Sequence, residues 1–556
     1  MEGIIKFFRA RWVGLALTLG SVVAISLAHW LGVFDILELK SYDYRFSSIR
    51  GPLTGWTARD STYLAMGTDV VLVEVDDEAY RLIPEEWPYP RGEIWGRVVR
   101  NLYKAGAKVI AFDIQFDAPD RRSEYLRDFA EKVTSEEVRE LIPRHGDQML
   151  GEAIAEAQAY GTKVVLNVKM VTEPNLQPPQ YIAYPVEAIM KGHPLTGLIN
   201  DQMDDDQFSR RYAVGGFMLH QPNLLYPTLG LKCVEAFMDI PDTTKMRYDA
   251  KERVWIYGPF RIPPYGKTNT FLVNYYGPAS GYKLQTQENV PAWGTFPRFS
   301  LAQVIDTEDF MLRSPEEDID WMSQFLPGEI PEWIEAIEDS AERHEMMEMM
   351  GLGESFDIKQ SPFYNKIVVI GVAVEVLHDV KSTPFYSYLG IPQLTPGMET
   401  HANAIQTILD GNYLKVVGSR LTDLFYDYPW IHSAIIALLA LIAFFLLDFV
   451  NPFIAAVLLI VEGLIYFGIV GGLFMDDLSW FIKEGLQKIL PMSFVEGKAW
   501  LETALPKPGR SVVVPLVAPL TGIVLTYISN VLYRFLNEQK DKRFLKSTFG
   551  AYISPE

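Results

Sequence analysis

Residues 95–114, WGRVVRNLYKAGAKVIAFDI, contain the pattern that decides the fold class. The first half of this stretch has apolar residues at the spacing of one helix face, namely Val98, Val99, Leu102 and Tyr103. The second half, 107–114, is a short and nearly continuous apolar run, which is typical of a strand buried on both faces of a parallel sheet. A helix that leads into a buried strand is the repeating unit of α/β proteins.

The same alternation continues on both sides of this stretch. Further apolar runs predict strands at 70–75 (VVLVEV), 163–168 (KVVLNV) and 366–371 (KIVVIG). Helical patterns between and after these runs end near Gly161 and Gly411. The sequence therefore predicts an α/β domain with a mainly parallel sheet flanked by helices.

The composition of the 556-residue chain excludes several functional classes. The chain has 70 Asp and Glu against 50 Lys and Arg, so its net charge is -20. This acidic balance disfavours a protein that binds the phosphates of nucleic acids. The single cysteine, Cys233, excludes an intramolecular disulfide and a multi-cysteine zinc site. Hydrophobic residues still make up 49% of the chain. This apolar excess must lie in particular segments.

Those segments lie near the two ends of the chain. Residues 12–34 carry no charge, and a helix of this length spans about 34 Å against a hydrocarbon core of about 30 Å. A cleaved signal peptide is the alternative, but its apolar region would be only about 7–15 residues long and no small-x-small cleavage motif follows. We predict three more transmembrane helices at 430–449, 453–474 and 511–533.

Four crossings would place both termini on one side of the membrane. Basic residues in 1–11 and 534–556 flank the outermost helices, so the positive-inside rule predicts that both termini are cytoplasmic. Residues 35–429 would then be extracytoplasmic (periplasmic), in a multi-pass protein of the inner or plasma membrane. The loop 475–510 would also lie outside. Its apolar spacing predicts a helix that is either interfacial or packed under the large domain.

Polar residues follow the predicted strands, where open parallel sheets bind ligands. The candidate ligand-binding residues are Asp76, Arg91, Asp113, Asp379 and His401, with His378 nearby. Their carboxylates predict a pocket for a small cationic or metal-bound ligand. The alternative is structural: Asp77 caps the next helix, and Asp113 forms a buried pair with Arg91.

The sequence contains no recognisable motif for catalysis or metal binding. No spacing matches a metal site, a phosphate loop or a nucleophile motif, so we predict no metal ligands and no catalytic residues in this chain. The pattern favours a binding module over an enzyme. The segment 315–350, dense in Glu, Asp and Met, predicts a solvated helical insertion.

Glu462 lies near the middle of the predicted helix 453–474, where a charge is costly unless it is protonated or has a partner. One hypothesis is a polar contact that couples helices within the membrane, either inside one chain or across a dimer. The candidate partners within the chain are His432, Tyr527 and Asn530. The other hypothesis is a protonated, passive side chain that faces protein.

Several blocks between 35 and 425 resemble, in order, the extracytoplasmic CHASE sensor domain of the second type. The blocks are ELKSYDYRF (38–46), VVLVEVDDEAY (70–80), WPYPRGEIWGRVVRNLYKAGAKVIAFDIQF (87–116), DDDQFSRR (204–211), VNYYGP (273–278), YNKIVVIGVAVEVLHDVKSTP (364–384) and PGMETHANAIQTILDGNYL (396–414). The resemblance implies a sensor domain followed by three membrane helices and an unidentified extracytoplasmic ligand or protein partner. The insertion 315–350 departs from the family's compact form.

The C-terminal segment 535–556 resembles the junction that leads into a class III nucleotide cyclase. The matching residues are Phe549, Tyr552, Ser554, Pro555 and Glu556. This resemblance implies a bacterial receptor adenylate (or guanylate) cyclase whose catalytic residues lie beyond Glu556. It further implies a homodimer, cAMP synthesis, and Mg or Mn in the missing cyclase domain, with no cofactor in this chain.

Two other interpretations remain open at the level of sequence. One is a non-enzymatic membrane scaffold that carries a sensor-like domain. The other is a receptor for a histidine kinase output, although FGAYISPE lacks the His-bearing motif with which such an output begins.

Overall fold

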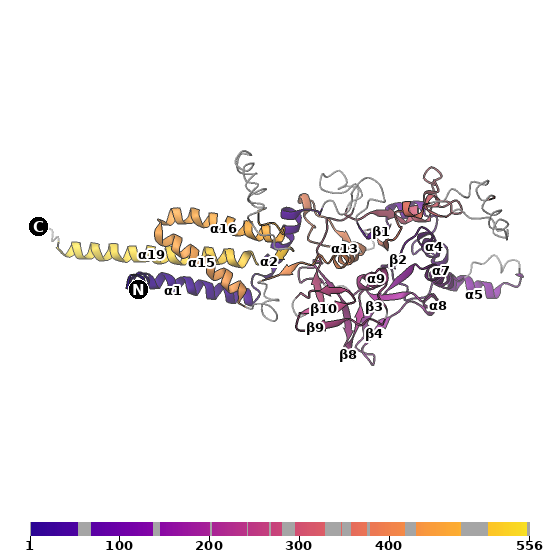
Figure 1. Cartoon of the computed structure of the whole chain (residues 1–556), viewed down its shortest axis with the longest axis horizontal. Helices are drawn as coiled ribbons and strands as arrows, with labels where there is room; N and C mark the ends of the chain where they lie inside the picture. The colour runs from indigo at the N-terminus through magenta and orange to yellow at the C-terminus, as the bar shows by residue number, and fades with distance from the viewer. Residues whose placement is uncertain are drawn as a thin grey trace. The chain divides into compact units, whose positions relative to one another are not determined.

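The computed structural model comprises two units. It describes residues 2–53, 68–136, 145–200, 203–241, 243–265, 268–280, 295–327, 346, 357–374, 379–417, 430–479 and 510–552. Residues 51–262 and 269–412 form an α/β unit, and residues 1–50, 263–268 and 413–556 form a helical unit (Figure 1). The predicted start of the cyclase domain at 553–556 and most of the predicted interfacial helix lie outside the described residues.

The α/β unit is built on a sheet that has seven strands among the described residues. The strands are, across the sheet, β13 (Arg298–Ser300), β1 (Val70–Val75), β14 (Ile367–Val372), β2 (Val109–Phe112), β3 (Lys163–Thr172) and β4 (Gln180–Ala183), and β5 (Leu195–Leu198) also pairs with β3. Only β4 is antiparallel to its neighbour. The strands β1 and β2 are buried at every residue, which is why they read as continuous apolar runs.

Helices cover both faces of the sheet. One face packs against α3 (Asp77–Leu82), α4 (Gly96–Lys104), α7 (Gly146–Tyr160) and α10 (Leu301–Ile305), and the other against α9 (Leu229–Phe237) and α13 (Gly397–Asp410) (Figure 1). The core of the first face runs in register across four strands through Val71, Val368, Ile110 and Val164. The predicted fold class, a mainly parallel sheet flanked by helices, is confirmed.

Two helix ends confirm the sequence pattern in detail. Gly161 follows α7 with φ 107°, and Gly411 follows α13 with φ 61°. Both values lie in the left-handed region that glycine adopts at little cost, so these residues end their helices where the sequence predicted.

Smaller elements complete the α/β unit. They are α5 (Arg121–Lys132), α8 (Glu187–Met190), β6 (Arg211–Ala213), β7 (Gly215–Met218), β8 (Gln221–Pro227), β9 (Arg247–Asp249), β10 (Val254–Tyr257), β11 (Phe260–Ile262), β12 (Thr270–Leu272), β15 (Val380–Lys381) and β16 (Thr395–Pro396). The block 204–211 leads into β6 and centres on Arg210, whose side chain is fully buried and pairs with Asp204 and Asp206.

The expectation of a solvated insertion from residue 315 is wrong for its first part. The 3-10 helix η5 (Trp321–Phe325) packs into the main core, where Trp321 contacts Phe299 and Phe363. The apolar residues of η5 could not be recognised as core positions from composition, because Asp and Glu dominate the segment around them. Residues 328–345 and 347–350 lie outside the described part of the chain.

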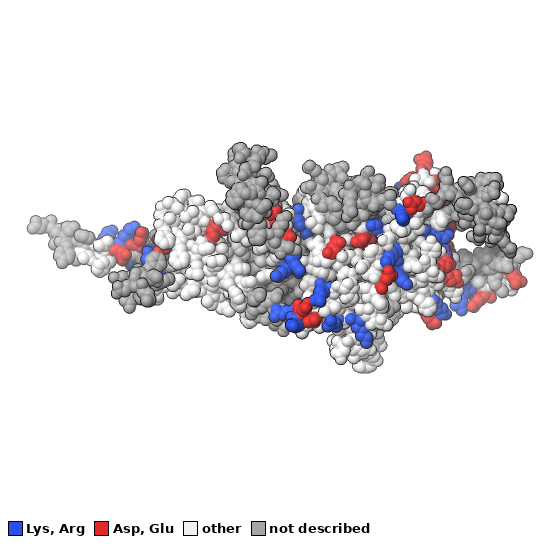
Figure 2. Space-filling model, viewed as in Figure 1, with Lys and Arg blue, Asp and Glu red and all other residues white. Residues whose placement is uncertain are grey.

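The helical unit contains α1 (Glu2–Trp30), α15 (Ile431–Phe449), α16 (Pro452–Phe474) and α19 (Val517–Tyr552), with the shorter α2 (Asp35–Tyr44). The helices α1, α15 and α19 pack along one another (Figure 1). Figure 2 shows that the surface of these helices is largely uncharged, whereas Lys, Arg, Asp and Glu are scattered over the α/β unit and the end of α19.

Three of the described helices, not four, are long and apolar enough to cross a membrane. They are Arg11–Trp30, Ile431–Phe449 and Pro452–Phe474. The prediction of a fourth such helix at 511–533 is wrong in this respect. Val512–Val513 form strand β18, which pairs with β17 (Lys415–Val416), and α19 begins only at Val517. Polar residues such as Thr526 and Asn530 then lower the hydropathy of α19.

Charged side chains connect the packed helices at both ends of the helical unit. At the start of α19, the Glu38 carboxylate accepts hydrogen bonds from the backbone N–H groups of Leu516, Val517 and Ala518 at 2.8–3.0 Å. At the other end, Asp448 of α15 pairs with Arg11 of α1 and with Arg534 of α19. These contacts tie α2 and α1 to α19 and α15.

Candidate functional site

A cavity of about 410 Å³ lies at the carboxyl ends of strands in the α/β unit. Its lining comes from three strand ends, from the first turn of α13 and from the β15 segment: Asp113, Gln115, Asn167, Lys169, Ile199, Asn200, Asp379, Lys381, Gly397, Thr400 and His401. Open parallel sheets bind ligands at this edge, outside the carboxyl ends of their strands.

The cavity carries charges of both signs. The carboxylates of Asp113 and Asp379 face a space that is also lined by Lys169 and Lys381. Asp379 Oδ1 lies 3.9 Å from Lys381 Nζ, at the limit of an ion pair. A binding site with both acidic and basic groups suits a small polar molecule that itself carries both charges.

Gly397 allows Asp379 to approach the start of α13. A Cβ atom at this position would lie 2.5 Å from either carboxylate oxygen of Asp379, so any side chain would displace the carboxylate. The backbone N–H of Gly397 also donates to the carbonyl of Asp379 at 2.9 Å. The sequence block that contains Gly397 therefore positions one wall of the cavity.

A chain of buried polar groups orients His401. The N–H of Gly230 donates to the hydroxyl of Tyr212 at 2.9 Å, and Tyr212 lies 2.7 Å from Nδ1 of His401. The hydroxyl of Tyr212 and Nδ1 of His401 therefore share one hydrogen bond, which fixes the orientation of the imidazole ring. Burial raises the pKa of the Tyr212 hydroxyl, so this hydroxyl stays protonated. The Nε2 atom of the oriented ring lies 3.6 Å from Oδ2 of Asp113, so the two side chains are neighbours in the cavity.

Sequence reasoning missed Tyr212. It directly follows the block 204–211, which was the available signal, but nothing in the pattern indicated that a residue of β6 would reach α13. The partnership requires the tertiary fold, since Tyr212 and His401 are 189 positions apart.

Two further buried carboxyl groups, on α13 and on β1, lie outside the lining of the cavity. Glu399 is fully buried, and both of its carboxylate oxygens accept the N–H of Ser280 at 3.0 Å. Glu74 of β1 accepts a hydrogen bond from Arg298 at 2.7 Å. Burial raises the pKa of Glu399 to about 7 and that of Glu74 to about 8. Glu399 therefore attaches α13 to the segment of Ser280, and Glu74 joins β1 to β13; neither lines the cavity.

The structure does not bring all five predicted residues together. Asp113, Asp379 and His401 line one cavity, whereas Asp76 and Arg91 lie elsewhere. Asp76 caps α3 by accepting the N–H of Ala79 at 2.9 Å, so the expectation that Asp77 is the cap is wrong.

The expected pair of Asp113 and Arg91 is also wrong. Arg91 instead pairs with Asp147 and donates to the carbonyl of Ala118. It lines a separate cavity of about 700 Å³ together with residues such as Tyr89. His378 lies outside the described residues.

Glu462 is buried in the helical unit, at 8% exposure, and neither carboxylate oxygen has a hydrogen-bond partner within the described part of the chain. The three expected partners bond elsewhere: His432 to Ser433, Tyr527 to Pro452, and Asn530 to Thr18 and Thr526. A contact of Glu462 across a dimer stays a prediction.

An α/β unit with a polar cavity, joined to helices that are long and apolar enough to cross a membrane, is the architecture of a membrane-anchored sensor. Comparison with family models matches residues 20–447 to the CHASE2 domain, and the chain belongs to this family. CHASE2 is an extracytoplasmic sensor domain of signalling receptors. No curated protein and no solved structure matches the chain.

Proposed function

We propose that this chain is the sensory and membrane part of a bacterial receptor adenylate cyclase, and that the cavity at the carboxyl edge of the sheet receives its signal. The observation that carries the sensory part is the mixed charge of that cavity, which is lined by Asp113 and Asp379 and also by Lys169 and Lys381. We infer a small zwitterionic ligand. This refines the sequence-based expectation of a cationic or metal-bound ligand, because two lysines lie beside the acids.

The output domain is proposed from the resemblance of 535–556 to a cyclase junction. Such an output would need Mg or Mn in its own catalytic domain and would act as a homodimer. A non-enzymatic scaffold and a histidine kinase receptor are the alternatives. The coding sequence downstream of Glu556 distinguishes them, since a cyclase requires two metal-binding aspartates in a strand context there.

The contacts at the start of α19 support a route for the signal. The chain passes from α2 into the α/β unit, while α19 continues toward the C-terminus. Glu38 of α2 is hydrogen-bonded to the first N–H groups of α19, and the fully buried Arg45 donates to the carbonyl of Val514 at 2.8 Å. A displacement of α2 would therefore move α19. A ligand that binds one arrangement of these two helices more tightly would increase the population of that arrangement.

We also propose that both termini are cytoplasmic. The support is that α19 lies against α1 and α15, and that Arg534 reaches Asp448 beside Arg11. A polar helix such as α19 can lie in the membrane if its polar groups bond to neighbouring helices. The Asn530 side chain does so by donating to Thr18 at 3.1 Å.

The ligand class is tested by binding to the whole chain in lipid nanodiscs. Small amino acids, dicarboxylates and diamines are compared by calorimetry. We expect zwitterions to bind best, and Asp379→Asn and Lys381→Gln each to weaken that binding about 10- to 100-fold, because each removes one charge-assisted contact.

The matched control is Lys191→Gln, an exposed lysine of the same unit whose loss leaves binding unchanged. Equal weak binding of all three ligand classes, or no effect of either cavity variant, would contradict the proposed site.

A further inference from the structure

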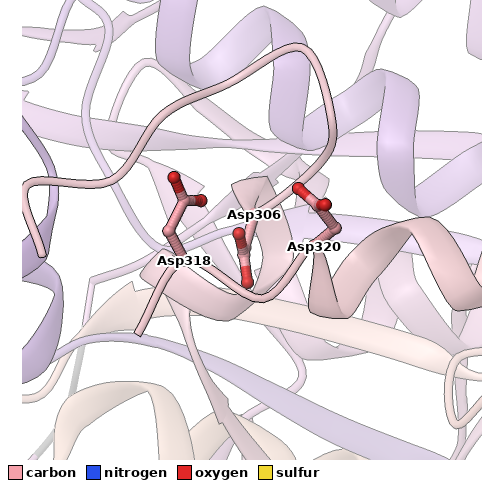
Figure 3. Close-up of side chains that lie close together, drawn as sticks. All are labelled: Asp306, Asp318 and Asp320. Carbon is pink, nitrogen blue, oxygen red and sulfur yellow. The ribbon is translucent and has the colours of Figure 1, made fainter. Parts of the chain in front are cut away.

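Three aspartates converge at the edge of the α/β unit, outside the cavity. Asp306 follows α10, and Asp318 and Asp320 lie at the end of the loop that leads to η5. One carboxylate oxygen from each lies within 4.8 Å of the other two, and Figure 3 shows Asp306 between the other two side chains. These residues are called the aspartate cluster.

The central carboxylate is buried and incompletely paired. Asp306 is 2% exposed, and its Oδ2 accepts the N–H of Trp321 at 2.9 Å. Its Oδ1 has no hydrogen-bond partner within the described part of the chain, and the same holds for the buried Oδ1 of Asp318. Buried carboxylate oxygens are nearly always satisfied, so two neighbouring ones that no donor group of the described chain reaches require a bound cation or a proton shared between them.

Nearby basic side chains do not supply that charge. Arg97 is engaged by Asp309, and Arg81 by Glu317. Among the described residues, no Lys, Arg or His forms an ion pair with a member of the cluster.

The framework of the cluster is rigid. The carbonyl of Asp306 accepts the N–H of Met322 at 2.8 Å, and Met322 and Phe325 belong to the main core. The carboxylate of Asp306 is therefore held in place by packed elements, unlike a surface acid that turns into solvent.

We propose that the aspartate cluster binds a divalent cation, and that this cation is Ca²⁺. Oxygens on opposite sides of a calcium ion are up to about 5 Å apart, because each Ca–O distance is about 2.3–2.6 Å, so the three oxygens fit around one ion. Calcium accepts carboxylates in irregular geometry together with water, which the exposed Asp320 leaves room for. Sites of this open kind bind with dissociation constants of about 10⁻⁴–10⁻³ M, the range of extracellular modules.

Bound Ca²⁺ would fasten the loop 307–320 to the end of α10. That loop also contacts the end of α3. The side chain of Arg313 donates to the carbonyl of Pro84 at 2.9 Å, and the backbone N–H of Arg313 donates to the carbonyl of Leu82. The ion would thus stabilise the edge of the sheet formed by β13 and β1.

The test uses the whole chain in lipid nanodiscs, with CaCl₂ and Tb³⁺ as probes. Trp321 is next to Asp320, so Tb³⁺ in the cluster is excited through the indole and emits. We expect saturable emission that Ca²⁺ displaces, and a rise of about 2–4 °C in the melting temperature at 10 mM Ca²⁺ compared with 10 mM Mg²⁺.

Asp306→Asn is expected to abolish both signals, and Asp320→Asn, at an exposed position, to weaken Ca²⁺ binding about tenfold without affecting folding. The matched control is Glu316→Gln, an exposed acid of the same loop, which keeps wild-type binding. Equal Ca²⁺ effects in wild type and Asp320→Asn, or a wild type that ignores Ca²⁺ while Asp306→Asn melts at a higher temperature, would overturn the proposal. The latter result would mean that the carboxyl groups share a proton instead.

Discussion

Replacement of Glu38 by alanine is expected to release the start of α19. The carboxylate accepts three backbone N–H groups, of Leu516, Val517 and Ala518, at the positive end of a long helix. Hydrogen bonds to a charged group are worth about 1.5–3 kcal/mol each, and they are not additive, so we expect a local loss of about 3–5 kcal/mol. Hydrogen exchange of these three amides should accelerate at least 100-fold.

Two variants of the same helix sharpen this test. Glu38→Gln keeps an acceptor but loses the charge, and its amides should exchange at an intermediate rate. Lys40→Ala changes an exposed residue of α2 and should leave exchange unchanged. If all three variants exchange like the wild type, Glu38 does not join α2 to α19, and the proposed route for the signal loses its support.

Replacement of Arg210 by alanine is the second change with a large expected effect. Its guanidinium is fully buried, lies 2.8 Å from both Asp204 and Asp206, and stacks 4.6 Å from the ring of Phe208. Removing it leaves Asp206 without its partner and Asp204 with Arg211 alone, which costs about 3–5 kcal/mol. Arg210 also holds the pKa of Asp206 below its ordinary value, so this part of the stability is present at neutral pH and lost as the pH falls.

The consequence of losing Arg210 should extend to the cavity. The neighbouring N–H of Ser209 donates to the carbonyl of Ser382 at 2.8 Å, directly after Lys381. We expect a lower unfolding midpoint in denaturant together with weaker ligand binding.

Arg211→Ala, at a residue that pairs with Asp204 and is partly exposed, should cost clearly less. Combining Arg210→Ala with Asp206→Asn should recover part of the loss. An Arg210→Ala protein as stable as the wild type would show that this buried cluster has no structural role.

The sheet could be predicted because its information is local. Strands such as 70–75 and 366–371 are apolar at nearly every position, and Gly161 and Gly411 end helices through their own backbone preferences. Because open parallel sheets bind ligands at the carboxyl ends of their strands, we expect Asp113, Asp379 and His401 to lie near one another. The structure brings these three residues into one cavity.

The remaining errors share a physical cause, which is that side-chain partners depend on tertiary packing. Asp76 and Asp77 are both plausible caps by sequence, and only the backbone angle of Asp76 decides between them. Tyr212 and the aspartate cluster depend on contacts between distant segments. The hydropathy of 511–533 predicts one helix, but Val512–Val513 pair as a strand with Lys415–Val416.

The most direct test of a ligand cavity in an extracytoplasmic sensor is chemical labelling of Lys381→Cys in intact spheroplasts. The native Cys233 is fully buried, and its burial raises the pKa of the thiol, so the wild type should not react and serves as the negative control. Lys191→Cys, at an exposed position, is the positive control. We expect a membrane-impermeant maleimide to label Lys381→Cys equally before and after permeabilisation. Labelling of Lys381→Cys and Lys191→Cys only after permeabilisation would contradict it.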